Sequence, residues 1–390
     1  MTDNHVKLLT LCRAISGIPL AKSAGVENCP GDERPLLDLL QYHQVAVLAY
    51  YYRESLASAG SPLEQGVLDQ LKSYTLLNIS RVMVYEHYLK HLDDLLQSQA
   101  VDYRLFKGIV TARSVYPEDY LRAFGDADIL IRPENLKIVE LLLEKDSFTH
   151  ADDLYRVFPD EIIQKYFFAQ HFLRRNPNNV AVDLHLNMSG RLHPFQFDSD
   201  DFWNGSRSFQ LDGHELKTFD PEHQAVYAIY HAFKHYFFKL IWFIDAFLLL
   251  DRADLDRSKF QALIQKYKLS KLLNYYVIIT DELFGRLPVG LADTHRSGRG
   301  RNSLINSSTV LSGFLPYSPS RARLLLPMYY LKGPCTRFGF LWRQLFPPME
   351  TVRDFYVGKN AGKGFLKYVK LRCKAIADLC LNKTKEEYSN

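Results

Sequence analysis

The hydrophobic pattern of the chain changes its period twice, and this constrains the fold more than any other feature. Apolar residues recur every three or four positions across residues 63–99, which contain no proline and one glycine, and this spacing predicts helix. Between residues 101 and 216 the pattern becomes short, strand-like runs separated by turns, and the helical period returns after Pro221. We therefore predict an α+β fold, with a small mixed β-sheet core embedded in helical N- and C-terminal regions.

The composition is that of a globular protein rather than a fibrous or disordered one. Of the 390 residues, 47% are hydrophobic and 24% are charged, and a chain of this length corresponds to two or three domains. The net charge of +4 is too small to indicate nucleic-acid binding by itself.

The cysteines and the apolar segments predict a cytoplasmic protein. The five cysteines are scattered without CxxC spacing, so they predict neither a disulfide framework nor a zinc ribbon. The apolar run at the N-terminus is too short for a signal peptide. The most membrane-like stretch, residues 225–250, is interrupted by charges such as Lys239 and Asp245, so it predicts a buried helix and no transmembrane segment.

The changes of pattern divide the chain into five regions. They are a helical N-terminal region (1–100), the α/β core (101–216), a helical region that packs on the core (217–285), a loop or linker (286–320) and a basic helical C-terminal region (321–390). Within the first region, residues 35–52 predict one helix opened by Pro35, and residues 63–99 predict one long helix or two in succession.

The core begins with a strand, a turn and a helix. Residues 101–106 alternate as a strand and end at Lys107 and Gly108, after which residues 109–115 predict a short helix. Residues 122–132 predict a turn at Gly125 that leads into a second strand.

Three aspartates fall on the strands of this core. Asp126 and Asp128 lie two apart on one predicted strand, so both carboxylates point to one face, and Gly125 allows a tight turn and the close approach of a ligand. Asp183 lies on another strand, in a predicted antiparallel hairpin of residues 167–173 with 180–186. If the two strands are neighbours, the three carboxylates converge, and such a group is typical of a Mg²⁺ site that can hold two ions about 4 Å apart.

Basic residues near these aspartates suit a phosphate group. Lys107 and Gly108 open a predicted helix, whose N-terminal N–H groups can cradle a triphosphate while the ammonium neutralises one phosphate. Arg122 can add a bidentate contact. A bare DxD pattern is weak, because it is common in solvated turns, but the ordered set of strand-Lys-Gly-helix, Arg-x-x-Gly-Asp-x-Asp-strand and strand-Asp is far more restrictive.

The segments that carry this set resemble the polymerase-β-like nucleotidyltransferase superfamily, and within it a poorly characterised bacterial family. The matching text is LFKGIVTARSVYPEDYLRAFGDADILIRPENL (105–136) followed by VDLHLN (182–187). Outside the core, His43 and residues 231–235 and 242–245 match as well. The likeness therefore covers roughly residues 43–250.

The resemblance implies transfer of a nucleoside monophosphate from an NTP donor, with Mg²⁺, or alternatively Mn²⁺, bound by the catalytic residues. The implied catalytic and metal-binding residues are Asp126, Asp128 and Asp183, and the residues expected around the nucleotide are Lys107, Gly108, Arg122, Gly125 and His185. The chain departs from the superfamily in its phosphate loop, where Lys107-Gly108 stands in place of Gly-Ser and Asp126 follows Gly108 by 18 positions.

The histidines of the hairpin leave alternatives open. His185 shares the strand face of Asp183, where it contacts a phosphate, orients Asp183, or is a core histidine bonded to a backbone carbonyl. His171 has the same ambiguity, and a structural role is favoured.

A second histidine group follows the core. His231, His235, Lys239 and Trp242 share one helical face. Zinc is disfavoured, because no Glu follows the first His and no third ligand is evident. Contact with substrate from a helical lid and simple packing both remain open, with Asp245 as a partner for Lys239 or for a backbone N–H.

The last 70 residues carry 14 Lys/Arg against 5 Asp/Glu, a balance of +9, interleaved with aromatic residues. This pattern fits single-stranded nucleic acid, peripheral contact with an anionic membrane, or a solvated helical face over a core.

Together these features predict a Mg²⁺-dependent nucleotidyltransferase with a two-metal mechanism. The acceptor is a metabolite or sugar, a protein or an RNA, and the basic C-terminal region mildly favours an anionic one. The alternative is a non-catalytic partner protein of the same fold in a polysaccharide or polymer assembly system.

Overall fold

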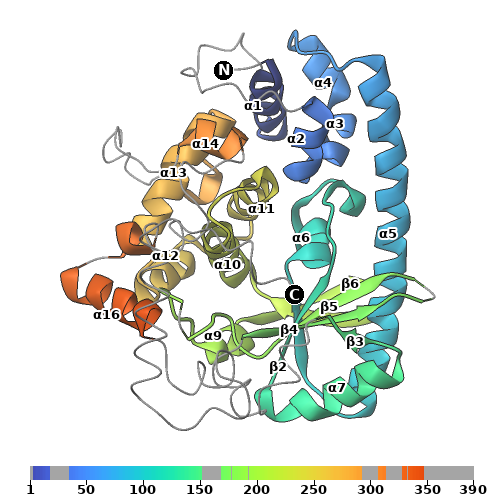
Figure 1. The fold of residues 1–390 in the computed structure, drawn as a ribbon, viewed down its shortest axis with the longest axis vertical. Coiled ribbons are helices and arrows are strands. Elements are labelled where there is room, and N and C mark those ends of the chain that lie inside the picture. The colour runs from blue at the N-terminus through green and yellow to red at the C-terminus, as the bar shows by residue number, and fades with distance from the viewer. Residues whose placement is uncertain are drawn as a thin grey trace, which may run out of the picture.

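The computed structural model describes residues 3–17, 35–151, 168–176, 178–191, 193–291, 306–312, 327–331 and 333–346. These residues build a seven-stranded mixed sheet with helices on both of its faces (Figure 1). The α+β prediction is confirmed by this arrangement.

The sheet brings together strands that are far apart in the sequence. They are β1 (Tyr103–Phe106), β2 (Ala127–Ile131), β3 (Thr149–His150), β4 (Ala169–Arg174), β5 (Val180–His185), β6 (Ser206–Leu211) and β7 (His214–Phe219). The order across the sheet is β3-β4-β5-β2-β1-β7-β6. The β2–β5 and β1–β7 pairs are parallel and the remaining four are antiparallel, which includes the predicted β4–β5 hairpin.

Helices precede, interrupt and follow the sheet. Those before it are α1 (Asp3–Ile15), α2 (Leu36–Tyr42), α3 (Ala46–Tyr51), α4 (Arg53–Ser58) and α5 (Gln65–Ser98). Those between strands are α6 (Gly108–Val115), η1 (Asp119–Leu121), η2 (Pro133–Asn135), α7 (Leu136–Lys145) and α9 (Ser199–Asn204). Those after it are α10 (Pro221–Lys234), α11 (Leu240–Leu250), α12 (Arg257–Lys266), α13 (Ser270–Phe284), η4 (Val289–Leu291), α14 (Ser307–Ser312) and α16 (Pro334–Leu345).

The two faces of the sheet belong to different hydrophobic cores. Ile129 and Val182 pack with the C-terminal half of α5 and with α7, whereas Phe106 and Leu130 pack with α10 and α11. Alternation along β2 explains this, because consecutive side chains of a strand point to opposite faces. Asp128 is two residues from Leu130, so its side chain lies on the face covered by α10 and α11.

Helix α5 is continuous over 34 residues, which decides between the two predictions for this stretch. Figure 1 shows it along one side of the molecule, from the N-terminal helices to the sheet. Its buried residues beyond Asn78 recur at helical spacing and end at Leu96.

The prediction of one helix over residues 35–52 is wrong. The segment forms α2 and α3, separated by a joint at which Gln44 has a φ of 58°. His43 is fully buried in this joint, where its Nδ1 accepts a hydrogen bond from the Leu240 N–H (3.2 Å) and its Nε2 donates to the Leu311 carbonyl (2.8 Å). These contacts tie the joint to α11 and α14, so long-range hydrogen bonds hold a break that no local glycine or proline signals.

The regions toward the C-terminus are described in part. The predicted loop over residues 286–320 contains η4 and also α14, whose Val310 and Leu311 are buried, so this part is not a plain linker. Residues 292–305, 313–326, 332 and 347–390 lie outside the described residues. The domain boundaries stay predictions.

Within the described stretches, no helix is both long and apolar enough to cross a membrane. Helix α11, which covers part of the most membrane-like stretch, has 11 residues. All but two of them are buried in the protein core.

Candidate active site

Asp128 and Asp183 lie side by side on neighbouring strands. They are directly paired in the parallel β2–β5 register, and the predicted convergence of these strands is therefore observed. Asp128 is only 3% exposed. One oxygen of each carboxylate and one nitrogen of His185 all lie within 4.8 Å of one another, a spacing that can hold a metal ion.

Asp126 stands just before β2 and is less enclosed than Asp128. Its carboxylate is not part of the group within 4.8 Å. Burial, and then repulsion from Asp128 and Asp183, raises the pKa of Asp126 to about 7. The three carboxylates thus share one electrostatic environment, and two of them share a potential ligand position.

Two donors hold Asp128. The Lys107 ammonium forms an ion pair with its Oδ1, and His185 Nε2 lies 2.8 Å from the same oxygen. Burial opposes ionisation of this carboxylate, but Lys107 and the hydrogen bond from His185 outweigh it and hold the pKa of Asp128 well below its usual range.

The backbone at Lys107 is strained. Its φ of 55° and ψ of −151° fall in a region that is nearly exclusive to glycine, and the residue caps α6 directly after β1. Gly108 has a φ of +32°, and a Cβ there would lie 3.3 Å from the Asp126 carbonyl oxygen. The predicted strand-Lys-Gly-helix turn is therefore present, and it packs directly against the segment that carries the aspartates.

His185 is a buried histidine that serves Asp128. It lies against the rings of Phe106 (4.8 Å between centroids) and Phe168 (5.7 Å) and is 1% exposed. Burial lowers the pKa of His185 to about 4, so the neutral ring donates its Nε2–H to the carboxylate. One of the predicted alternatives was that His185 orients Asp183. That prediction is wrong, because the carboxylate bonded to His185 is Asp128.

His171 pairs with the other carboxylate of the site. Its Nδ1 contacts Asp183 Oδ1 from the neighbouring strand β4, where the two residues are in register. About half of the His171 side chain is exposed, so this contact lies at the open side of the carboxylate pair.

Of the two roles predicted for Gly125, the conformational one is wrong, whereas the close approach of a ligand stays a prediction. Its φ is not in the left-handed region, so the turn does not need a glycine. A Cβ at Gly125 would meet nothing within 4 Å, so the space beside the aspartates is open at this point. The loop is instead held by α5, since the Tyr85 hydroxyl donates to the Gly125 carbonyl (2.6 Å) and Asn78 donates to the Tyr120 carbonyl (2.6 Å).

Arg122 is committed to a protein partner rather than free for a phosphate. Its Nε and Nη2 donate to both carboxylate oxygens of Asp245 at 2.8–3.1 Å, and the Tyr116 hydroxyl donates to the same carboxylate at 2.7 Å. Burial disfavours the charge, but Asp245 outweighs it and raises the pKa of Arg122. The prediction of Lys239 or a backbone N–H as the partner of Asp245 is wrong, because α11 packs Asp245 onto the loop before the aspartates.

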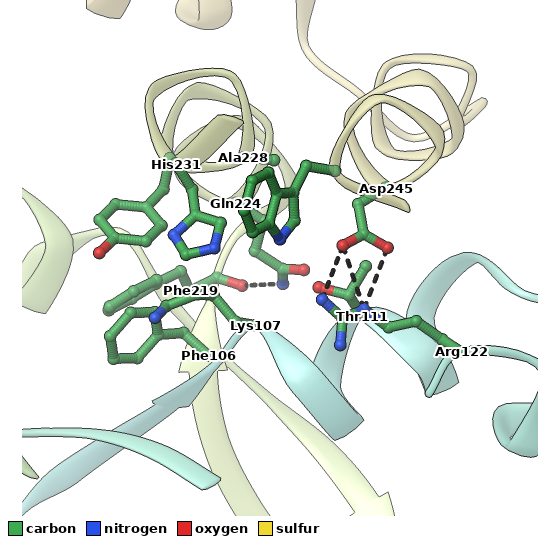
Figure 2. A pocket seen from close by; sticks show the side chains of 11 residues that line it. Phe106, Lys107, Thr111, Arg122, Phe219, Gln224, Ala228, His231 and Asp245 are labelled. Carbon is green, nitrogen blue, oxygen red and sulfur yellow. Dashed lines mark hydrogen bonds and ion pairs between the residues drawn. The ribbon is translucent and has the colours of Figure 1, made fainter. Parts of the chain in front are cut away.

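His231 and Trp242, from the helical face predicted on α10 and α11, lie over the segments of the core that carry Lys107 and Arg122. His231 and Trp242 line a cavity of about 20 Å³ together with Lys107 and Arg122. Figure 2 shows His231 and Asp245 above this cavity and Lys107 and Arg122 below it. The Trp242 ring contacts both His231 (5.3 Å between centroids) and His235 (4.8 Å).

Lys234 lies near the site, although the sequence does not distinguish it from the other charges of the apolar stretch 225–250. It ends α10, and its Nζ lies 3.8 Å from the centroid of the Phe168 ring. Burial, and then repulsion from Lys107, lowers the pKa of Lys234 to about 7. Its position three residues after His231 on the same helical face was the available signal.

A paired set of strand carboxylates, a Lys-Gly turn into a helix and a helical cover define a nucleotidyltransferase-type site. The chain belongs to a family described as uncharacterised nucleotidyltransferases, whose family model matches residues 30–285. The predicted resemblance is confirmed at this level. No curated protein matches the chain.

Among solved structures, one match is an antigenic nucleotidyltransferase-like protein from Paracoccidioides brasiliensis. It is 16% identical, covers 48% of this chain and 91% of its own, and has a TM-score of 0.28.

Proposed function

We propose that the protein is a Mg²⁺-dependent nucleotidyltransferase that moves a nucleoside monophosphate from an NTP to an acceptor. The observation that carries the proposal is the direct pairing of Asp128 with Asp183, within a chain of this family. Two carboxylates on one buried face repel each other unless a cation lies between them. Carboxylate oxygens are the ligands that Mg²⁺ prefers, and Mn²⁺ is the alternative.

The donor set fits such an ion. Asp128 and Asp183 supply oxygens within 4.8 Å of each other. The Lys107 ammonium contacts Asp128 with the positive charge that a metal ion would also provide. Asp126 completes the set when the group assembles around metal. His185 acts through its hydrogen bond, which orients Asp128.

The chemistry supplied by bound Mg²⁺ is charge stabilisation on the transferred phosphoryl group and activation of the acceptor hydroxyl. The acceptor oxygen bonds to the α-phosphorus while the bond to the bridging oxygen of the β-phosphate breaks, and pyrophosphate leaves with that electron pair. The acceptor proton passes to solvent. Lys107 would neutralise a phosphate of the bound triphosphate, and Gly108 would allow the backbone of α6 to approach it.

Arg122 acts indirectly in this scheme. Because its guanidinium is held by Asp245, it positions the loop that leads to Asp126 instead of contacting the triphosphate. The acceptor is a metabolite or sugar, a protein or an RNA, and the cytoplasmic location stays a prediction from the sequence.

The test uses α-labelled NTPs with Mg²⁺ or Mn²⁺ and a cell lysate separated into small molecules, RNA and protein. Label in one fraction, absent with Asp183→Asn and absent in EDTA, is the expected result and identifies the acceptor class. No label and no pyrophosphate release from any NTP, with wild-type folding confirmed, would overturn the proposal.

The non-catalytic alternative has one observation in its favour. Lys107 and His171 already pair with the two carboxylates, so the site is electrostatically satisfied by protein groups. A partner protein of this kind would bind nucleotide without releasing pyrophosphate, which the same assay measures.

A further inference from the structure

Two aromatic rings connect Lys234 to the carboxylate pair. Its ammonium sits over Phe168 at 3.8 Å, the Phe168 ring lies 5.7 Å from the His185 ring, and His185 is bonded to Asp128. Lys234 therefore reaches the site from α10, opposite the strands that carry the aspartates.

The ammonium of Lys234 differs from the other cations of the site in its partners. Lys107 pairs with Asp128 and Arg122 pairs with Asp245. Across the stretches that the structure describes, no carboxylate lies within ion-pair distance of Lys234, and its contact is the face of the Phe168 ring. A mostly buried cation with only a ring beneath it has unused hydrogen-bonding capacity, because an ammonium carries three donors.

Its nearest cations add positive charge, and Asp128 and Asp183 act on it only electrostatically, without an ion-pair contact. Lys107 and the rings of His231 and His235 lie close by, and burial, together with the nearby lysines, lowers the pKa of both histidines. Burial, and then Lys107, likewise lowers the pKa of Lys234, so the protein alone disfavours this charge. An anionic ligand would reverse that penalty.

A strained turn fixes the direction of Lys234. Tyr236 and Phe237 follow α10 directly and both have a φ of 59°, a left-handed conformation that is costly for bulky residues. The Phe237 N–H donates to the Ala232 carbonyl (2.7 Å), and the Phe237 ring is 1% exposed. Burial of Phe237 thus holds the end of α10, and Lys234 with it, in one orientation.

A simpler role for Lys234 is to complement the dipole at the C-terminus of α10. Cations there contribute about 0.3–1 kcal/mol, and they do so with the ammonium in water. Lys234 is instead mostly buried, with its ammonium over the Phe168 ring and within electrostatic range of Asp128 and Asp183. The dipole does not account for that position.

The net charge of the site with divalent ions bound indicates which kind of ligand Lys234 would contact. Asp126, Asp128 and Asp183 are offset by Lys107, Lys234 and Lys239, so each bound divalent ion leaves two positive charges in excess. A polyphosphate supplies the compensating negative charge, whereas a nucleoside without phosphates does not.

Resting on the proposed function, we propose that Lys234 is the second phosphate-binding cation of this site. With Lys107 it holds the β- and γ-phosphates of the NTP, the part that leaves as pyrophosphate. Breaking the α,β-bridge adds negative charge to this leaving group, and Lys234 stabilises it at the moment of transfer.

The experiment is calorimetric titration of inorganic pyrophosphate, each NTP and each nucleoside monophosphate, in Mg²⁺, into the wild type and Lys234→Met. We expect the variant to bind pyrophosphate and NTP about tenfold or more weakly, with the affinity for monophosphates unchanged. Lys234→Arg, which keeps the charge, should retain most of the affinity. Lys90→Met is the matched control, because this lysine of α5 pairs with Asp212 outside the site, and the variant should behave as the wild type.

Each contrary result has a distinct meaning. If Lys234→Met binds pyrophosphate as the wild type does, if both ligand classes weaken by the same factor, or if the wild type binds no pyrophosphate, the inference is overturned. Pyrophosphate binding that depends on Lys234, without turnover of any NTP, would contradict the proposed enzyme and leave the anion site standing. Melting curves of both Lys234 variants separate these results from loss of the fold.

Discussion

Asp128 and Asp245 are both buried, and each is bound by a cationic side chain and a second hydrogen-bond donor. Asp128 has the single ammonium of Lys107 and the ring of His185, and it faces Asp183 across the strand pair. Asp245 has the planar guanidinium of Arg122 on both oxygens, with a tyrosine hydroxyl on one of them.

The difference shows that the partner, rather than burial, decides whether a carboxylate is available for chemistry. An ammonium is a compact point charge on a flexible stem and can be exchanged for a metal ion, whereas a guanidinium fork is matched to one carboxylate and saturates it. Asp128 therefore belongs to a site that can change state, and Asp245 to a joint between α11 and the core.

Asp128→Asn gives the largest expected effect and tests the first half of the comparison. Nucleotidyl transfer should fall by about 10³-fold, because a positioned electrostatic group at the reacting phosphate is lost. The fold should be retained with a stability loss of about 1–3 kcal/mol, because Lys107 loses its charged partner. Initial rates of pyrophosphate release and a thermal melt measure the two quantities. Full activity in this variant would contradict the metal assignment.

Asp245→Ala tests the other carboxylate of the comparison, and here we expect a loss of stability rather than of activity. Removal of one partner leaves the Arg122 charge buried without compensation, and the free energy of unfolding should drop by about 3–5 kcal/mol. Urea denaturation measures it. The paired change Arg122→Met with Asp245→Leu is the control and should cost much less. A loss of activity at unchanged stability would assign Asp245 to the chemistry instead.

Lys107→Met asks whether a metal ion can replace the ammonium. In EDTA the variant should lose about 1–3 kcal/mol of stability, because the Asp128 carboxylate keeps its burial and loses its cation. Millimolar Mg²⁺ should restore more stability to the variant than to the wild type. Melting curves with and without Mg²⁺ measure the difference, and an equal response of both proteins would show that Mg²⁺ does not take the place of Lys107.

His43→Ala tests whether α11 must be held for Asp245 to reach Arg122. The variant leaves the Leu240 N–H and the Leu311 carbonyl without their partner, at a cost of about 1–2 kcal/mol. Unfolding in urea measures this cost. His43→Gln, which keeps one donor and one acceptor, should recover part of it, and equal stability of the wild type and the alanine variant would show that the joint does not depend on this ring.

Asp220 provides the smallest effect and a pH test outside the site. Its side chain caps α10 by accepting a hydrogen bond from the His223 N–H (3.0 Å). Burial opposes ionisation of this carboxylate, but the contacts with His223 and Lys259 outweigh it and lower the pKa of Asp220 to about 2. Its unfolded pKa is about 4, so the unfolded chain binds the proton first. The contribution is therefore complete above about pH 4 and lost as the pH falls toward 2.

Asp220→Asn keeps a cap side chain and removes the charge, so it should remove this pH-dependent part, with a loss of about 1 kcal/mol at neutral pH from the weakened Lys259 contact. Unfolding free energies between pH 2 and pH 7 provide the measurement. A variant whose profile keeps the full acid dependence of the wild type would assign that dependence to other carboxylates.

The strands that carry the site were predictable from local sequence, whereas β3, β6 and β7 were not predicted. Asp128 and Asp183 were placed on strands from short-range alternation, and the Lys107–Gly108 turn was found where the pattern changes from strand to helix. The part of the site that lies within one element, or between strands that pair, follows from these signals.

The cover of the site was not predictable in the same way. The Arg122–Asp245 pair joins residues 123 positions apart, and nothing local indicates that α11 would supply this partner. The break after His43 depends on hydrogen bonds to residues 197 and 268 positions away. Lys234 is recognisable as a site residue only after α10 has packed over the sheet.

By itself, the sequence determined the strands that carry Asp128 and Asp183 and which of their side chains share a face, because these follow from backbone preferences and a fixed side-chain period. Only the tertiary structure decided which charge meets which. It paired Asp128 with an ammonium, paired Asp245 with a guanidinium and placed the Lys234 ammonium over the Phe168 ring. Those partners are chosen when helices and strands distant in the chain pack together, since a buried charge keeps its stability only through the groups that packing brings to it.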